Sequence, residues 1–236
     1  MKTAIVTGAS KGIGRVIALK LASLGYSLTI VGRNETQLST LKTKIEEPGV
    51  SCLVLSDDLN DEKAPERIIK ETISHFGQLD LLINNAGSAH SANILETDTA
   101  IWNKLFYVNA RAPFFLCKAA VPHLKKSENP IIINIGSVVG FKGYEGQAAY
   151  SSSKHALAGF TKVLAKEVQD DGIQVHLISL GGVNTEMVQE MRPDINTDEL
   201  IQPEEIAELI EFLITRKGRG TIDHFYLRRK SGRAFD

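Results

Sequence analysis

The chain has 236 residues, of which 43% are hydrophobic and 23% charged, and its formal net charge at pH 7 is −1. A chain of this length can bury a core large enough to fold without disulfides or structural metals, and its balanced charge gives no overall field for nucleic acid or an anionic membrane. The separated Cys52 and Cys117 form no CxxC pair and are typical of a reducing compartment. With no leader-like start and no apolar stretch near the roughly 20 residues of a membrane span, we expect a cytoplasmic protein that binds neither membranes nor nucleic acid.

Short apolar runs alternate along the chain with segments of helical periodicity. Strands are expected at residues 3–7, 28–32, 52–56, 79–84, 131–135, 175–180 and 224–227, and helices are expected to begin near Gly12, Glu35, Ala64, Ile101, Ala149 and Gln202. Strands that are apolar at nearly every position are typical of a parallel sheet covered by helices on both faces. We therefore predict one domain over residues 1–236, a doubly wound, Rossmann-type three-layer α/β fold with a mostly parallel seven-stranded sheet.

The first predicted strand runs into a glycine-rich loop, Thr7-Gly8-Ala9-Ser10-Lys11-Gly12-Ile13-Gly14. Glycine lets a pyrophosphate approach bare backbone, and the helix that follows presents free N–H groups to an anion. The spacing is Gly-x-x-x-Gly-x-Gly and not the Gly-x-Gly-x-x-Gly of the usual dinucleotide fingerprint. A tight strand-to-helix turn without a ligand is the alternative, but the position at the first strand–helix junction favours nucleotide binding.

The end of the second predicted strand indicates which dinucleotide is bound. NAD-selective folds place an acidic residue there for the ribose 2′-OH, whereas this chain has Arg33, and Lys11 lies in the glycine loop. Either cation can bind a 2′-phosphate through charge-assisted hydrogen bonds worth roughly 1.5–3 kcal/mol each. The residues therefore favour NADP(H) as cofactor, against the alternative that both are ordinary solvated surface charges.

A candidate proton donor lies in the helix expected from Ala149. Tyr150 and Lys154 are one helical turn apart, and Ser137 follows the fifth predicted strand. Carbonyl reduction needs an acid, and an ammonium about 5 Å away contributes around 3 kcal/mol towards lowering a tyrosine pKa from near 10, while a serine hydroxyl can hold the substrate oxygen. The alternative is that these are a packed tyrosine, a surface lysine and a strand-end serine with no catalytic role. Tyr226 and Lys230 have the same spacing, but they lie on a predicted strand, where residues four apart do not meet.

These motifs together resemble the short-chain dehydrogenase/reductase family over essentially the whole chain. The resemblance rests on the loop from Thr7 to Gly14, on Asn84-Asn85-Ala86-Gly87, on Asn109 in the long helix, and on Ser137, Tyr150 and Lys154 at the family's Ser-to-Tyr spacing. It implies an NADP(H)-dependent oxidoreductase that interconverts a carbonyl and a secondary alcohol. The implied catalytic tetrad, in which the asparagine holds a water and the lysine also binds the nicotinamide ribose, is Asn109, Ser137, Tyr150 and Lys154.

The same resemblance implies a full set of cofactor-binding positions. Asp58 and Leu59 would lie near the adenine, Asn85, Ala86 and Gly87 along the cofactor, and Val183 and Thr185 at the carboxamide. The other expected cofactor-binding residues are those of the glycine loop, the two cations and the catalytic pair: Gly8, Ser10, Lys11, Gly12, Ile13, Gly14, Arg33, Tyr150 and Lys154. Members of the family commonly pair through the helices that here begin near Ile101 and Ala149, so a homodimer or homotetramer is expected.

Two departures from the family pattern affect these expectations. In the segment that resembles Asn-x-x-x-Pro-Gly-x-x-x-Thr, His176 replaces the asparagine and Leu180 the proline. Loss of the proline is expected to loosen one turn beside the nicotinamide. The chain end at residues 222–229 lacks the Val-Asp-Gly-Gly of many tetrameric members, which argues against the larger assembly.

The expected substrate is a small or medium carbonyl compound of low polarity. The segment between Glu186 and Gln202 is short enough to be a small lid that contributes Met187 and Met191, and Phe141 and Tyr144 are expected on the opposite wall. These apolar side chains are equally typical of plain core.

A 3-oxoacyl-[acyl-carrier-protein] reductase is the specific alternative, because residues 137–149 resemble that group. Lys125 and Lys126 would serve as a docking patch for the acidic carrier protein, but Asp170 and Asp171 oppose such docking.

Two further readings come from other classes of protein. A non-catalytic NADP(H)-sensing protein would be favoured by a missing tetrad residue, and none is missing. The basic tail at Arg228, Arg229 and Lys230 is more typical of a solvated terminus than of a nucleic-acid site. His90 and His123 have no companions spaced to complete a metal site, so no metal is expected.

Overall fold

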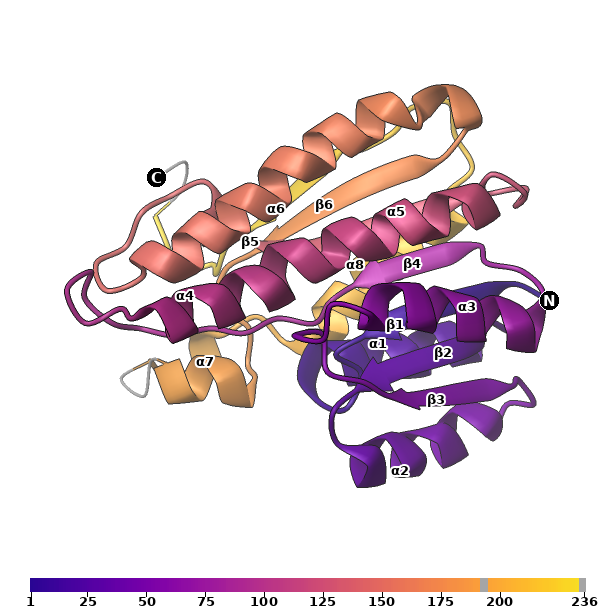
Figure 1. Ribbon diagram of the computed structural model, residues 1–236, viewed down its shortest axis with the longest axis horizontal. Coiled ribbons are helices and arrows are strands. Elements are labelled where there is room, and N and C mark those ends of the chain that lie inside the picture. The colour runs from indigo at the N-terminus through magenta and orange to yellow at the C-terminus, as the bar shows by residue number, and fades with distance from the viewer. Residues whose placement is uncertain (192–194, 234–236) are drawn as a thin grey trace.

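The structure is a computed structural model that describes residues 1–191 and 195–233. Its centre is a seven-stranded sheet in the order β3-β2-β1-β4-β5-β6-β7, in which every neighbouring pair is parallel (Figure 1). The strands are β1 (Thr3–Thr7), β2 (Ser27–Gly32), β3 (Cys52–Ser56), β4 (Leu81–Asn84), β5 (Ile131–Ser137), β6 (Gln174–Leu180) and β7 (His224–Leu227). The strand order reverses between β1 and β4, so the predicted doubly wound, Rossmann-type sheet is confirmed.

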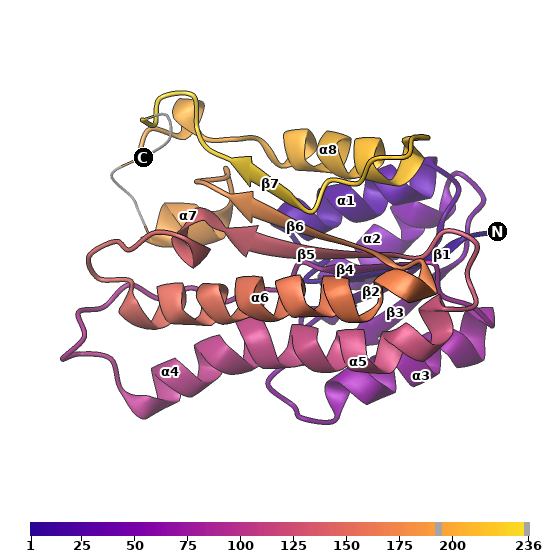
Figure 2. The ribbon, with the colours of Figure 1, turned by 90° about the horizontal axis from the view of Figure 1, so that it is seen from above.

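Helices cover both faces of the sheet. They are α1 (Gly12–Ser23), α2 (Glu35–Glu46), α3 (Ala64–Phe76), α4 (Thr99–Phe106), α5 (Ala112–Leu124), α6 (Ala148–Glu167), α7 (Glu186–Met191) and α8 (Pro203–Thr215). Figure 2 shows α1, α2 and α8 on one side and α3, α5 and α6 on the other. The result is the three-layer arrangement that the sequence predicts.

Each face of the sheet has its own hydrophobic core, and successive strand residues alternate between them. Ile131 and Ile133 of β5 pack in the core shared with α1, α2 and α8. Ile132 packs in the core shared with α3 and α5. Because both faces are buried, these strands are apolar at most positions, which is why they could be predicted from the sequence.

The helix that carries Asn109 is not regular. It begins at Thr99, where the Asp98 side chain caps it by accepting from the Ile101 N–H at 2.7 Å. A π-helical turn, Tyr107–Arg111, then separates α4 from α5. Such turns are rare and are frequently found at functional sites, and this one places Asn109 inside the molecule with no exposed surface.

The turn after β6 is firmly held, which corrects the expectation that losing the family proline loosens it. Leu180 is paired with Ser137 on one side and Leu227 on the other. The Gly181 N–H donates to the Leu227 carbonyl at 2.7 Å, and Val183 forms a bridge with Ile201. A leucine keeps the backbone N–H that proline lacks, so β6 can pair to its last residue.

The structure also bears on the two cysteines, on membrane-spanning helices and on metal-binding clusters. Burial raises the pKa of both Cys52 and Cys117 to about 12, which makes the two thiols unreactive near neutral pH. Within the described ranges, no helix combines the length and apolar character needed to cross a membrane. The same residues contain no group of three or more His, Cys, Asp or Glu side chains arranged to hold a metal ion.

Candidate active site

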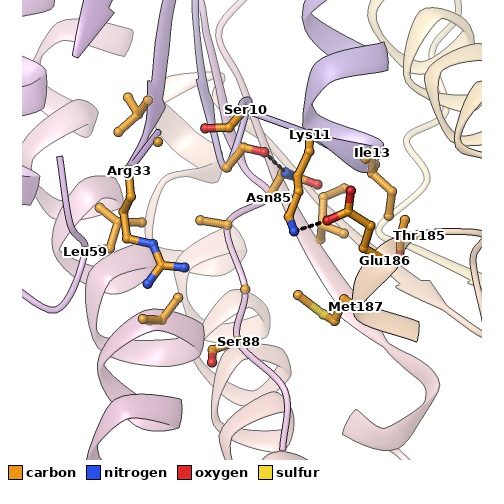
Figure 3. A pocket seen from close by; sticks show the side chains of 18 of the residues that line it. Ser10, Lys11, Ile13, Arg33, Leu59, Asn85, Ser88, Thr185, Glu186 and Met187 are labelled. Carbon is orange, nitrogen blue, oxygen red and sulfur yellow. Dashed lines mark hydrogen bonds and ion pairs between the residues drawn. The ribbon is translucent and has the colours of Figure 1, made fainter. Parts of the chain in front are cut away.

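A cavity of about 520 Å³ opens at the carboxyl ends of the strands. Figure 3 shows its lining side chains coming from the β1–α1 loop, the end of β2, the segments after β3 and β4, and α7. The predicted site residues that line it are Gly8, Ser10, Lys11, Gly12, Ile13, Arg33, Asp58, Leu59, Asn85, Ala86, Gly87, Ser137, Tyr150, Lys154, Val183, Thr185 and Met187. One cavity thus joins the glycine loop to the candidate catalytic residues.

The glycine loop is packed against the segment that follows β4. The Thr7 hydroxyl accepts from the backbone N–H groups of Asn85 and Ala86 at 3.0 Å each, and the Asn85 amide donates to the Thr7 carbonyl at 2.9 Å. Gly8 has a φ of +67°, and a Cβ there would lie 2.8 Å from the Ala86 Cα. Bare backbone is therefore required at this point.

The start of α1 is also suited to bind an anion. Its N-cap residue, Lys11, makes no side-chain capping hydrogen bond, and no acidic residue lies in the first turn. The first N–H groups of the helix and its positive end therefore face the cavity. This loop and helix start suit the pyrophosphate of a dinucleotide.

Replacing Gly14 with alanine is expected to destabilise the protein and remove this fit. The new Cβ would lie 2.3 Å from the Gly8 carbonyl oxygen and 2.4 Å from the Asn85 amide nitrogen, so the loop must move, at a cost of about 1–3 kcal/mol. Urea unfolding measures the change in the free energy of unfolding. Gly159→Ala is the matched control, because Gly159 also lies in a helix but a Cβ there has nothing within 4 Å; it is expected to stabilise by about 0.5–1 kcal/mol. Equal effects of the two substitutions would contradict the packing argument.

The two cations expected at a 2′-phosphate lie apart. Lys11 forms an ion pair with Glu186 at the start of α7, on the opposite side of the cavity from Arg33 (Figure 3). Arg33 is exposed at the cavity edge, and no residue in the described ranges pairs with its guanidinium. Arg33 is therefore the cation that is free to receive an anion in this structure.

Ser137, Tyr150 and Lys154 all line this cavity. Ser137 is the last residue of β5, and its hydroxyl donates to the Leu180 carbonyl at 3.3 Å and accepts from the Val139 N–H at 3.3 Å. Lys154 is 6% exposed, and its ammonium donates to the Ile135 carbonyl at 3.1 Å. Burial lowers the pKa of Lys154 to about 8.

The pKa of Tyr150 departs from the expectation. Burial raises it above the ordinary value of 10, and the hydrogen bond with Ser137 opposes that rise only in part. We expected the Lys154 ammonium to lower it. The direction is reversed because partial burial of the phenol disfavours the charged phenolate. Without a bound cofactor, the phenol remains protonated at neutral pH.

Asn109 is held by residues that the sequence did not single out. Its amide donates to the Ser88 carbonyl at 2.8 Å and to the Ser153 hydroxyl at 3.0 Å, and its oxygen accepts from the Ser88 N–H at 2.8 Å. A Cβ at Gly87 would lie 3.5 Å from the Asn109 oxygen and 3.8 Å from the Lys154 nitrogen. Asn109 thus fixes the segment after β4 beside Lys154. Ser153 gave no signal of its own beyond its place before Lys154.

Only part of the predicted substrate wall lines the cavity. Met187 does, but Phe141, Tyr144 and Met191 are not among the lining residues. The Phe141 ring stacks on His224 of β7 with 4.7 Å between centroids, which turns it towards the sheet edge. Tyr144 is 48% exposed, and Met191 is the last residue of α7.

Comparisons with known proteins identify the family of the chain. Residues 2–196 match the family of short chain dehydrogenases. A carbonyl reductase family member 4 from Xenopus laevis is 34% identical over 218 residues, covering 90% of this chain and 91% of that protein, and a 3-oxoacyl-[acyl-carrier-protein] reductase FabG from Staphylococcus aureus is 31% identical over 227 residues, covering 92% of each. A metagenomic short-chain oxidoreductase, solved in complex with NADP, superimposes with a TM-score of 0.85 at 30% identity and covers 97% of each chain. The chain therefore belongs to the short chain dehydrogenase family of oxidoreductases.

Proposed function

We propose that the protein is an NADP(H)-dependent oxidoreductase that interconverts a carbonyl and a secondary alcohol, with Tyr150 as the proton donor and acceptor. The observation that carries the proposal is that one cavity is lined both by the glycine loop and by Ser137, Tyr150 and Lys154. The relatives named as a carbonyl reductase and an NADP-bound oxidoreductase support the same reaction class.

The chain offers a binding position for each part of the cofactor. The start of α1 receives the pyrophosphate, Asp58 and Leu59 the adenine, and Arg33 the 2′-phosphate. The segment Asn85-Ala86-Gly87 and Lys154 would hold the nicotinamide ribose side, and Val183 and Thr185 the carboxamide. The nicotinamide supplies or accepts the hydride when it is bound.

The chain's own residues supply the proton. Tyr150 is protonated at neutral pH, since its pKa lies above the ordinary value of 10, so it can donate to a carbonyl oxygen as negative charge develops there. Ser137 can turn its hydroxyl from the Leu180 carbonyl, a 3.3 Å contact, to the same substrate oxygen. The Lys154 ammonium stabilises the phenolate that forms. Because the Asn109 amide is occupied by Ser88 and Ser153, any relay water at Asn109 is bound through its backbone in the π-helical turn.

The test is the oxidation of NADPH, followed at 340 nm, against ketones, aldehydes, quinones, diketones and 3-oxoacyl thioesters. We expect turnover of at least one small or medium carbonyl compound of low polarity. NADPH that binds without turnover of any compound would favour the non-catalytic sensing protein. Failure to bind NADPH at all would refute both.

Arg33→Ala is expected to raise the KM for NADPH much more than that for NADH. Arg33 is exposed and lines the cavity, and loss of one charge-assisted contact corresponds to about ten- to a hundredfold. The KM for NADH should change by less than about threefold, since its ribose 2′-OH carries no charge. Initial rates with both cofactors measure the difference, and equal increases would refute the assignment.

A 3-oxoacyl-[acyl-carrier-protein] reductase is the second candidate, favoured by the similarity to FabG. Lys125, one of the two expected docking lysines, is paired with Asp171 at 2.8 Å, which neutralises part of the basic patch that an acidic carrier protein would need. Rates with a 3-oxoacyl group on the carrier protein and on a small thiol decide between the two. Preference for the carrier-bound substrate would support this candidate.

We also propose a homo-oligomer. Trp102 of α4 is 41% exposed and Phe114 of α5 is 48% exposed, and Trp102 stacks on Phe106 at 4.6 Å. Exposed aromatic groups on neighbouring helices are typical of protein interfaces. Sedimentation equilibrium measures the mass of the assembly, and a monomer at micromolar concentration would contradict the proposal.

A further inference from the structure

The edge of the cavity that holds Arg33 is also acidic. Gly32 of β2 pairs with Ser56 of β3, so the residues that follow, Arg33 and Asp57, leave the sheet on neighbouring strands about 5 Å apart. The Asp57 N–H donates to the Gly32 carbonyl at 3.0 Å, which keeps the two segments side by side. Asp57 lines the same cavity as Arg33. A carboxylate in this position is suited to pair with Arg33 or to repel a phosphate there.

Asp57 nevertheless pairs with a different arginine. Arg67, in the first turn of α3, donates from Nε to Asp57 Oδ1 at 3.1 Å and makes a second, closer contact to the same oxygen through a terminal nitrogen. That terminal nitrogen also donates to Asp61 Oδ2 at 2.9 Å. The Asp57 side chain is only 10% exposed. The two carboxylates hold the Arg67 guanidinium firmly, and they raise its pKa.

The other acidic residue at this edge is already satisfied within its own loop. Asp58 Oδ1 accepts from the Asn60 backbone N–H at 3.0 Å and from the Asn60 side-chain amide at 2.8 Å. Arg67 does not line the cavity. The negative charge near Arg33 therefore depends on whether the Asp57 carboxylate is neutralised by its partner, Arg67.

We infer that Arg67 is a positioning residue for cofactor selectivity: by holding the Asp57 carboxylate, it leaves Arg33 free to bind a ribose 2′-phosphate. The inference rests on the proposed use of NADP(H). Removal of Arg67 releases Asp57, whose charge then repels the phosphate and competes with it for Arg33. Both effects act on the 2′-phosphate and spare a ligand that lacks it.

Two fragments of the cofactor isolate this effect: 2′,5′-ADP carries the 2′-phosphate and 5′-AMP does not. Calorimetric titration of the full chain gives Kd for each. Arg67→Ala is expected to raise the Kd of 2′,5′-ADP about tenfold and that of 5′-AMP by less than about twofold. Asp57→Asn/Arg67→Ala is expected to restore most of the 2′,5′-ADP affinity, because no free carboxylate remains. Arg67→Lys, which keeps a cation beside Asp57, should stay within about threefold of the wild type.

Lys70→Ala is the matched control, since it removes an exposed positive charge from the same helix about one turn later. It should change neither Kd by more than about twofold, because exposed charges at a distance are screened. A purely structural role of Arg67 predicts parallel losses of both fragments and no restoration by Asp57→Asn. Either of those results overturns the inference.

The outcomes also separate the inference from the proposed function. If the wild type binds both fragments equally and Arg33→Ala alters neither, the preference for NADP(H) itself is wrong. If Arg33→Ala weakens 2′,5′-ADP selectively and Arg67→Ala does not, only the role of Arg67 is wrong. Circular dichroism verifies that the Arg67→Ala protein is folded. If it is unfolded, the Asp57→Asn/Arg67→Ala variant is compared with the wild type instead. A double variant that binds 2′,5′-ADP much more weakly than the wild type does, while its 5′-AMP affinity is unchanged, contradicts the inference.

Discussion

Tyr150→Phe is expected to lower kcat/KM for carbonyl reduction by about a thousandfold, the usual contribution of a positioned general acid. Phenylalanine keeps the ring but has no proton to donate. NADPH affinity should change by less than about threefold, because the glycine loop and Arg33 are untouched. Initial rates at 340 nm and a fluorescence titration with NADPH measure the two quantities separately.

Tyr226→Phe is the matched control for this result. Tyr226 and Lys230 repeat the Tyr-x-x-x-Lys spacing, but Tyr226 lies in β7 at the sheet edge and does not line the cavity. Its substitution should leave the rate within about twofold. A Tyr150→Phe protein that keeps a tenth or more of the wild-type rate would contradict the assignment, as would equal losses in the two variants.

Lys154→Met is expected to remove activity and yet stabilise the protein at pH 7. Burial lowers the pKa of Lys154 from 10.5 to about 8, and this difference corresponds to a cost of about 3 kcal/mol for keeping the charge inside the protein. Loss of the hydrogen bond to the Ile135 carbonyl offsets about 1 kcal/mol of that gain. The free energy of unfolding should therefore rise by about 2 kcal/mol, while the reduction rate falls about a hundredfold because the phenolate loses its neighbouring charge.

The pH dependence of that stability difference has a defined sign. Between pH 8 and 10.5 the unfolded chain keeps the Lys154 proton and the folded chain releases it, so wild-type stability rises with pH across this range. Lys154→Met has no such rise, and its advantage should shrink towards zero near pH 10. Urea unfolding at pH 7 and pH 10 measures both values.

Lys166→Met, at an exposed position of the same helix, serves as the control for Lys154→Met. It should change stability by less than about 0.5 kcal/mol at both pH values. A Lys154→Met protein that is less stable than the wild type at pH 7, or whose advantage is independent of pH, would show that the ammonium is not buried at a cost.

The sheet was predictable because burial on both faces leaves a continuous apolar signal, as in Ile131-Ile132-Ile133. The residues that line the cavity were predictable where they lie at or just after the end of a strand, as Ser137 and Arg33 do. The π-helical turn at Tyr107–Arg111 was not, since it contains neither glycine nor proline to mark it.

Pairings between distant residues also lay beyond the sequence. Lys11 meets Glu186 across 175 positions, and the partner of Asp57 is Arg67 although Arg33 leaves the neighbouring strand beside it. The direction of the Tyr150 pKa depends on burial, which spacing alone does not give. At Leu180, the missing family proline suggested a loose turn, whereas Leu180 is paired with both β5 and β7 and the Gly181 N–H donates to the Leu227 carbonyl of β7.

Calorimetric titration of the purified protein with NADPH is the most direct test of the cofactor site on which the whole account depends. We expect one NADPH per chain, with a Kd in the micromolar range and at least about tenfold weaker binding of NADH. An absence of heat up to millimolar NADPH, or binding that persists unchanged in a folded Gly14→Ala protein, would contradict the assignment of the cavity.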